Sequence, residues 1–293
     1  MPKERLNPVR HYERHLRRRW IRLGAESHFV QVRSERVHVL DIPGYGPLPP
    51  VVLVHGFSAS GPTQYSAVMH YLRPRVSRVI VPDLPGHGHS ALPTTVDADH
   101  MTEALAAAID QVVDKPVLMF ASSLGGAIGI RYAARSSSNL LGLMLCSPAG
   151  APMPEAHMQE FVHSLRIDGH AKAVHFVDRM YGRRRRTRHL HALAIRLQFL
   201  RPQFRRLLDQ VSLSELLSSQ DLAALHMPTQ LLWGEREALL PAANRDFFHR
   251  HLPAHAQLES PQNYSHVPFL ENPLELAQRI VDFARSIRPR NPR

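Results

Sequence analysis

A turn that carries two adjacent serines is the feature of this sequence with the clearest chemical meaning. The stretch FASSLGGAIG covers residues 120–129, between a segment of β-strand character and a segment of helix character. A serine on a sharp strand-to-helix turn is exposed for nucleophilic attack, as in the pattern G-x-S-x-G. Here Ala121 stands where that pattern has its first glycine, and both Ser122 and Ser123 are candidate nucleophiles.

The size of the neighbouring residues separates the two serines. The helix leaves such a turn so close to the strand that the residues two before and two after the nucleophile must be small. For Ser122 these neighbours are Phe120 and Leu124, which are bulky. For Ser123 they are an alanine and Gly125. We therefore predict that Ser123 is the nucleophile and that the backbone N–H of Leu124 faces a developing oxyanion.

A short motif of this kind also arises by chance in a glycine-rich turn, so its partners matter. A serine hydroxyl needs a base to take its proton, and the base needs an acid to fix its tautomer. His266 lies in NYSHVPFLENP, between the last short strand and the last helix that the pattern predicts. Glu235 and Glu237 lie in LLWGEREALLP, where a strand ends, so either residue is a candidate acid.

Alternating strand and helix patterns along most of the chain would position these residues. Val51–Gly56 and Leu140–Cys146 are continuous apolar runs, which are typical of central parallel strands. Met101–Val113 has the pattern of a helix. Two half-buried runs, Phe29–Ser34 and Arg36–Ile42, predict a hairpin near the start. The alternation predicts an α/β fold with a mostly parallel sheet and helices on both faces.

The strand pattern disappears between Ser147 and Leu225, where amphipathic helices are predicted instead. We interpret this segment as a helical insertion over the carboxyl edge of the sheet. The predicted organisation is a basic N-terminal arm (1–26), an α/β core (27–146 and 226–293) and a helical cap (147–225). Apolar faces of the cap would line an acyl pocket or pack on one another, and they contain Phe161, Val162 and Leu165; Val174, Phe176 and Val177; Leu193, Leu197 and Leu200.

Composition and length favour a folded protein without disulfides. The chain has 293 residues, of which 44% are apolar and 21% charged. The single cysteine, Cys146, excludes an intrachain disulfide and a multi-cysteine metal site. No apolar run approaches the roughly 18 residues of a membrane span. The N-terminal segment lacks the apolar core of a secretory signal, so we expect a cytoplasmic protein.

The net charge of +11 is concentrated in two segments. Residues 1–40 hold ten Lys and Arg against four Asp and Glu, and residues 151–225 hold twelve against seven. The second segment contains the run Arg183–Arg186, with Arg188 close by. Such runs are usually solvated, but together with the arm they favour peripheral contact with anionic lipid headgroups or an acidic substrate. No recognisable nucleic-acid-binding module accompanies the charge, which argues against a nucleic-acid partner.

Six segments, taken in order, resemble the α/β-hydrolase superfamily, in the type that has a serine nucleophile and a helical cap inserted after the sixth strand. They are VVLVHGF, VPDLPGHGHS, ASSLGG, LMLCSPAG, PTQLLWGEREALLP and SHVPFLENP. The resemblance covers about Val51 to Ile287. It implies a mostly parallel eight-stranded sheet flanked by helices, with the α-helical cap above it.

The resemblance also implies a role for each matching residue. Ser123 is the expected nucleophile and His266 the expected general base. The acid of the family's W-G-x-x-D-x-x-x-P pattern falls on Glu237, where this sequence has Glu in place of Asp; Glu235 is the alternative. The residue after the family's HG, here Phe57, is expected to give the second oxyanion N–H beside that of Leu124.

Two groups of histidines and acids are candidate metal ligands, but we favour other roles for them. The groups are Asp83, His87 and His89, and His249, His251 and His255. The first lies in DLPGHGHS, a loop whose role in the family is mostly architectural. Pro253 interrupts the helix that would align the second. Motifs of zinc hydrolases, P-loops and dinucleotide folds are absent, so we expect neither a metal nor a cofactor.

These residues and the resemblance together predict a serine hydrolase that cleaves a carboxylic ester, such as a lipid or acyl ester, through an acyl-enzyme intermediate. Two alternatives stay open. An acyltransferase on the same scaffold would pass the acyl group to an alcohol or amine in place of water. A non-enzymatic protein would use the pocket to bind a ligand or a membrane. Substrate identity, acyl chain length and oligomeric state are not indicated by the sequence.

Overall fold

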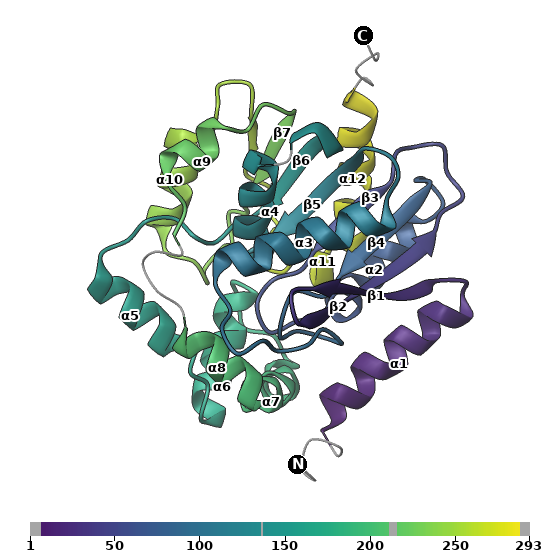
Figure 1. The fold of residues 1–293 in the computed structure, drawn as a ribbon. Coiled ribbons are helices and arrows are strands. Elements are labelled where there is room, and N and C mark those ends of the chain that lie inside the picture. Colours follow the sequence, from purple (N-terminus) through teal and green to yellow (C-terminus); the bar gives the residue numbers. More distant parts are fainter. Residues whose placement is uncertain (1–6, 136, 211–215, 288–293) are drawn as a thin grey trace.

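The computed structural model describes residues 7–135, 137–210 and 216–287. Within these ranges the chain forms an eight-stranded sheet in the order β1-β2-β4-β3-β5-β6-β7-β8 (Figure 1). The strands are β1 (Glu26–Val32), β2 (Glu35–Pro43), β3 (Val51–Val54), β4 (Arg78–Pro82), β5 (Val117–Ser122), β6 (Leu140–Cys146), β7 (Thr229–Leu232) and β8 (Gln257–Glu259). The strands from β4 to β8 are parallel, and β2 pairs antiparallel with both β1 and β4. The predicted hairpin and fold class are confirmed.

Helices cover both faces of the sheet, and Figure 1 shows α3 and α4 in front of it and α2 and α12 behind it. Their bounds are α2 (Gly61–Leu72), α3 (Ala98–Val112), α4 (Leu124–Arg135) and α12 (Pro273–Ser286). In β3, Val52 and Val54 join the core on one face, whereas Val51 and Leu53 join the core on the other. Because successive side chains of a strand point to opposite faces, a continuous apolar run serves both cores.

The predicted N-terminal arm contains a helix, α1 (Pro8–Arg22), that packs against the core. Its side-chain cap is Asn7, and proline follows at the first helical position, where its missing N–H costs nothing. Leu16 and Trp20 lie one turn apart and are 3% exposed. The Trp20 Nε1–H donates to the Ser66 hydroxyl at 3.0 Å. The sequence analysis described this segment only by its charge, and the helix is a finding of the structure.

The segment between β6 and β7 is helical, as predicted. It contains α5 (Glu155–Ser164), α6 (His170–Met180), α7 (Arg188–Phe199), α8 (Pro202–Asp209) and α9 (Ser219–Ala223). Two of these helices, α7 and α8, are separated just before Pro202. Proline disfavours helical backbone in the residue before it and removes a backbone donor, so α7 ends and α8 begins there.

The C-terminal part of the fold places two loops at the carboxyl edge of the sheet. The remaining helices are α10 (Ala242–His251) and the short α11 (Pro268–Glu271), with a 3-10 turn at Ser137–Asn139. One loop follows β7 and the other follows β8, so residues that follow parallel neighbours meet at one edge. None of the helices in the described ranges is long and apolar enough to cross a membrane.

Candidate active site

Ser123 occupies a strained turn between β5 and α4. Its φ is +52°, a left-handed conformation that residues other than glycine rarely adopt. Three backbone N–H groups stabilise the turn by donating to the Ser123 carbonyl, and they belong to Gly126, Ala127 and Ala149. A Cβ atom on Gly125 would lie 2.4 Å from the carbonyl oxygen of His55. The close approach that the sequence analysis inferred from residue sizes is therefore present in the structure.

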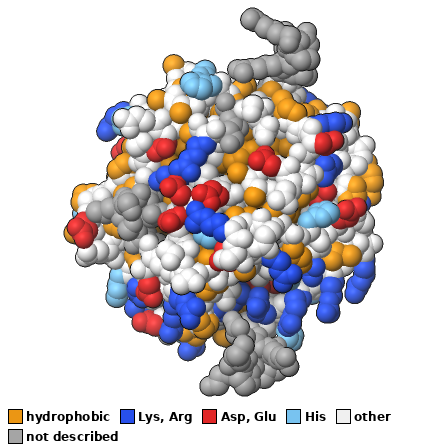
Figure 2. Space-filling model, viewed as in Figure 1, with side chains coloured by type: hydrophobic (Ala, Val, Ile, Leu, Met, Phe, Trp, Pro, Cys, Tyr) orange, Lys and Arg blue, Asp and Glu red, His pale blue; other side chains and the backbone are white. Residues whose placement is uncertain are grey.

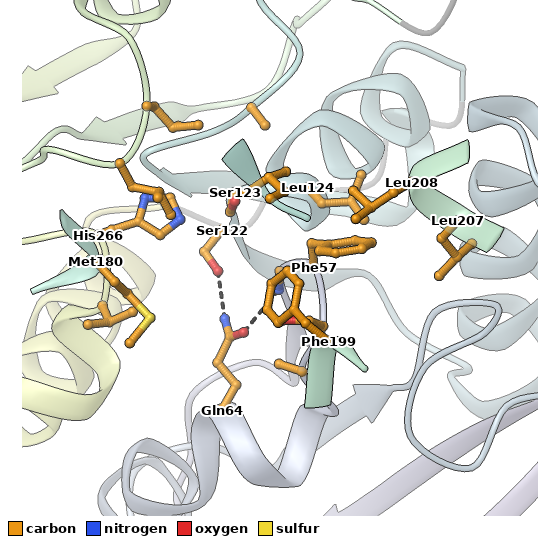
Figure 3. A pocket seen from close by; sticks show the side chains of 18 of the residues that line it. Phe57, Gln64, Ser122, Ser123, Leu124, Met180, Phe199, Leu207, Leu208 and His266 are labelled. Atoms are coloured by element: carbon orange, nitrogen blue, oxygen red, sulfur yellow. Dashed lines mark hydrogen bonds between the residues drawn. The ribbon is translucent and has the colours of Figure 1, made fainter. Parts of the chain in front are cut away.

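Ser122 points away from the position expected of a nucleophile. Its side chain is buried, and its hydroxyl lies 2.7 Å from the amide nitrogen of Gln64 and 2.9 Å from the Tyr65 hydroxyl. Figure 3 shows Ser122 directed at Gln64. The Ser123 hydroxyl, by contrast, makes no hydrogen bond with any part of the chain that the structure describes. The two adjacent serines thus have different surroundings, one bonded and one free.

The loop after β3 carries Phe57 beside the nucleophile turn. His55 holds this loop, because its Nδ1–H donates to the Gly56 carbonyl at 2.7 Å and its Nε2 accepts the N–H of Leu84 at 3.0 Å. Burial lowers the pKa of His55, so the ring is neutral at pH 7. Phe57 and Leu124, the two expected oxyanion residues, line the same cavity as Ser123.

Glu237 and His266 form a buried acid–base pair. Glu237 Oε2 lies 2.7 Å from His266 Nδ1, and Glu237 Oε1 accepts the N–H groups of Leu239 and Leu240 at 2.8 and 3.0 Å. Burial raises the pKa of Glu237, but the charge and hydrogen bond of His266, with the backbone donors, outweigh burial and hold that pKa below its ordinary value. The alternative acid, Glu235, is exposed and makes no side-chain contact with His266.

His266 and Ser123 face one cavity (Figure 3). Because Nδ1 of His266 is directed at a carboxylate, Nε2 is the nitrogen available to the serine side. No hydrogen bond joins the two side chains within the described structure, and such contacts often shorten only when substrate is bound. The structure therefore brings together all the residues expected in the site, which come from the ends of β3, β5, β7 and β8.

The cavity above these residues has a volume of about 750 Å³ and is lined mainly by apolar side chains. The predicted α5 face, Phe161, Val162 and Leu165, lies in its wall. Of the three apolar residues expected on one face of α7, Leu193 is 46% exposed, so the expectation was wrong for this residue, and Leu197 and Leu200 are partly buried but do not line the cavity. The α7 residues that line the cavity follow helical spacing and are His191, Ala194, Ile195, Gln198 and Phe199.

The predicted α6 face is divided between two environments. Phe176 lines the cavity, whereas Val177 is fully buried in the core that α6 shares with α7. Phe57 packs edge-on against Phe199 of α7 and Phe204 of α8, with ring centroids 5.8 and 5.6 Å apart. The cap therefore holds the loop that follows β3 and closes the cavity at the same time.

Asp83 joins three segments of the core through hydrogen bonds. Within the described residues, one group of three has ligand atoms close enough for a metal, and it comprises His38, Asp83 and His89. However, Asp83 accepts from His38 Nδ1 at 2.8 Å and from the backbone N–H groups of Gly61 and His89. Burial raises the pKa of Asp83, but hydrogen bonds with His38 and His89 hold it well below its ordinary value. These contacts fit the architectural role that we expected.

The other histidines of the two predicted ligand groups have separate partners. His87 contacts the ring of Phe57 at a centroid distance of 5.7 Å, and burial lowers the pKa of His87 to about 3. His255 Nε2 lies 3.0 Å from the Met227 carbonyl oxygen. The group of His249, His251 and His255 is not among the metal-like clusters of the described chain.

The arginine run is partly bonded to the core, which the sequence did not indicate. Arg183 and Arg185 both reach Glu271 Oε1, at 2.9 and 3.1 Å. The Glu271 side chain is 3% exposed, and its Oε2 accepts the hydroxyl of Ser265 at 2.6 Å. Ser265 directly precedes His266, so the run connects the cap to the loop that carries the acid–base pair.

Comparison with known proteins identifies related chains. Monoacylglycerol lipases ABHD6 from Bos taurus and Homo sapiens are each 26% identical over 266 residues, which cover 83% of this chain and 77% of the relative. The crystal structure of a membrane phospholipase A, a bacterial virulence factor, has a TM-score of 0.77 and 25% identity and covers 99% of this chain and 93% of that chain.

A second solved structure is similar to this chain in its fold alone. An esterase from Exiguobacterium antarcticum has a TM-score of 0.71 with 19% identity, and the match covers 89% of this chain and all of that chain. The family model described as the alpha/beta hydrolase family matches residues 51–279, a range that includes Phe57, Ser123, Leu124, Glu237 and His266. The resemblance inferred from six short segments is confirmed, and the chain belongs to the alpha/beta hydrolase family.

Proposed function

We propose that this protein is a serine hydrolase that cleaves the carboxylic ester of a lipid with a long acyl chain. One observation carries the proposal: Ser123 and the Glu237–His266 pair open into a single large cavity with mainly apolar walls. The names of the similar proteins, monoacylglycerol lipase and phospholipase A, support a lipid ester as substrate. In such a lipid the polar ester group would lie at Ser123, and the apolar acyl chain would fill the cavity beyond it.

The proposed reaction has two steps. Ser123 Oγ attacks the ester carbonyl carbon while His266 Nε2 takes the hydroxyl proton, and Glu237 stabilises the imidazolium that forms. The backbone N–H groups of Phe57 and Leu124 stabilise the tetrahedral oxyanion. His266 returns the proton to the departing alcohol, which leaves an acyl-enzyme. Water, deprotonated by the same histidine, then attacks the acyl carbon and releases the carboxylic acid and Ser123.

A basic surface beside the cavity supports docking on anionic membranes. Exposed arginines lie along α1, and α8 of the cap adds Arg205 and Arg206. Figure 2 shows Lys and Arg side chains gathered over α1 and the neighbouring cap. The N-terminal end of α1 contributes Val9 and Tyr12 to the cavity wall. A bilayer held by this surface would therefore lie next to the cavity that takes its lipids.

Replacing either serine of the turn distinguishes the nucleophile from its neighbour. Ser123→Ala is expected to lower ester hydrolysis by at least about 10³-fold, because the attacking oxygen is lost. It should also abolish labelling by a fluorophosphonate probe. Ser122→Ala should still label, since Ser123 remains. Labelling that survives in Ser123→Ala and disappears in Ser122→Ala would reverse the assignment.

The two glutamates after β7 provide a matched pair for the acid. Glu237→Gln is expected to lower kcat by about 10²–10⁴-fold, because a neutral amide cannot stabilise the imidazolium of His266. Glu235→Gln should remain close to the unmodified protein, since that side chain is exposed. The kcat of both variants is measured by steady-state hydrolysis of the same p-nitrophenyl ester. Equal losses in the two variants would mean that Glu237 is not the acid.

Chain-length dependence tests the lipid assignment. Across p-nitrophenyl esters from acetate upward, kcat/KM should rise about two- to fourfold for each added methylene until the cavity is filled, because each buried methylene is worth about 0.8 kcal/mol. Val162→Phe, in the cavity wall, should reduce the rise for long chains and spare the acetate. Leu193→Phe, on the exposed side of α7, is the control. A flat response to chain length would contradict a long acyl substrate.

Vesicle binding tests the basic surface of α1. Replacing Arg14, Arg18 and Arg22 together by Gln should weaken binding to phosphatidylglycerol vesicles by about 10²-fold, since each cation near an anionic surface contributes about 1 kcal/mol. Raising the salt to 1 M should have a similar effect. The control replaces Arg245 and Arg250 of α10, away from this surface (Figure 1). Electrostatic docking would be excluded if the protein did not co-sediment with the vesicles, or if its co-sedimentation did not depend on the salt concentration.

A further inference from the structure

A buried glutamine lies between the two loops that carry the proposed oxyanion donors. Gln64 belongs to the first turns of α2 and is 6% exposed. The loop of Phe57 lies on one side of its amide group and the turn of Ser123 on the other (Figure 3). Its sequence context indicates no role, and the proposed reaction does not use its side chain.

The Gln64 amide bonds to both loops at once. The Gly56 N–H donates to Gln64 Oε1 at 3.0 Å, and Gln64 Nε2 donates to the Ser122 hydroxyl oxygen at 2.7 Å. A backbone N–H can only donate, so the amide oxygen must face Gly56 and the amide nitrogen must face Ser122. The orientation of the amide is thereby fixed by its partners.

The chain of hydrogen bonds continues back to β3. Tyr65 donates its hydroxyl hydrogen to the Val54 carbonyl at 2.9 Å, and its oxygen lies 2.9 Å from Ser122 Oγ. Ser122 therefore donates to Tyr65 and accepts from Gln64. Ser122, which precedes the proposed nucleophile, is thus connected to Val54 through Tyr65 and to Gly56 through Gln64. Val54 and Gly56 lie on either side of His55.

Two members of this network lie close in sequence to a proposed oxyanion donor. Gly56 immediately precedes Phe57, and Ser122 is separated from Leu124 by the nucleophile alone. The members are buried, so their hydrogen bonds do not compete with water and a missing partner is costly. Glutamine suits the position because one side chain of that length supplies an acceptor and a donor. Methionine has a similar length but supplies neither.

We propose that Gln64 and Ser122 are positioning residues that set the spacing between the Phe57 and Leu124 N–H groups. This inference rests on the proposed function, in which those groups stabilise the oxyanion. The two side chains act through the backbone of the neighbouring residues and need no contact with substrate. Their contribution should appear when negative charge develops on the carbonyl oxygen, and only weakly in substrate binding.

The experiment compares Gln64→Met and Ser122→Ala with the unmodified enzyme. Gln64→Met should lower kcat by about 10–100-fold with KM changed less than about threefold, since misplacing one donor costs less than the 10²–10³-fold of removing it. Ser122→Ala keeps the bond between Gln64 and Gly56, so its loss should be smaller. Gln230→Met is the control, because Gln230 is equally buried but lies on β7 and bonds to Glu259.

A transition-state analogue separates positioning from a general structural defect. A long-chain trifluoromethyl ketone forms a hemiketal: the Ser123 oxygen bonds to the carbonyl carbon, the proton passes to His266, and the negative charge stays on the former carbonyl oxygen. Gln64→Met should weaken this inhibitor by the same factor as kcat/KM. The corresponding alkane, which has no carbonyl, should bind unchanged. Equal weakening of both ligands, or an unchanged kcat, would overturn the proposal.

The double variant Gln64→Met with Ser122→Ala adds an independent check. Because the two residues share one hydrogen bond, their effects on kcat should be less than multiplicative. Multiplicative effects would show that they act separately and would contradict the proposal. Failure of the proposed function has a different signature. In that case Ser123→Ala would retain activity, and the trifluoromethyl ketone would not inhibit the unmodified enzyme.

Discussion

The close approach of α4 to the end of β3 is the constraint on which the site depends. Only a residue without a side chain fits at Gly125, where a Cβ would meet the His55 carbonyl. This contact brings the first N–H of α4 beside the loop of Phe57. It also requires Ser123 to adopt a left-handed backbone that costs of order 1–3 kcal/mol. The donors around the Ser123 carbonyl help to offset that strain.

The parts of the site that depend on residue size and chain order could be predicted from the sequence. The small neighbours of Ser123 are visible in the sequence, and so are His266 and the two candidate acids, Glu235 and Glu237, that follow predicted strands. The choice of Glu237 came from the family resemblance. Gln64 could not be found in this way, because nothing in GPTQYSAVMHYL distinguishes a buried amide from a surface one. Its role depends on contacts with residues 8 and 58 positions away.

The misplaced Leu193 of α7 and the unpredicted helix α1 have a common physical cause. In α7, apolar residues occur on both sides of the helix, so Leu193 and Ile195 are equally plausible wall residues until the partners of the helix are known. In α1, arginines outnumber the apolar residues, and a narrow stripe through Leu16 and Trp20 is enough to bury one face. The net charge of the segment gives no sign of such a stripe, which becomes evident only from the contacts of Trp20 in the structure.

Hydrogen bonds and ion pairs of Glu271 connect the cap with the loop that carries His266. Arg183 and Arg185 neutralise this buried carboxylate from the cap, and Ser265 bonds to it from the loop of His266. Lifting this corner of the cap would leave a buried charge without its partners, which is unfavourable. This corner of the cap therefore resists separation from the core, and a rearrangement here would also disturb the loop of His266.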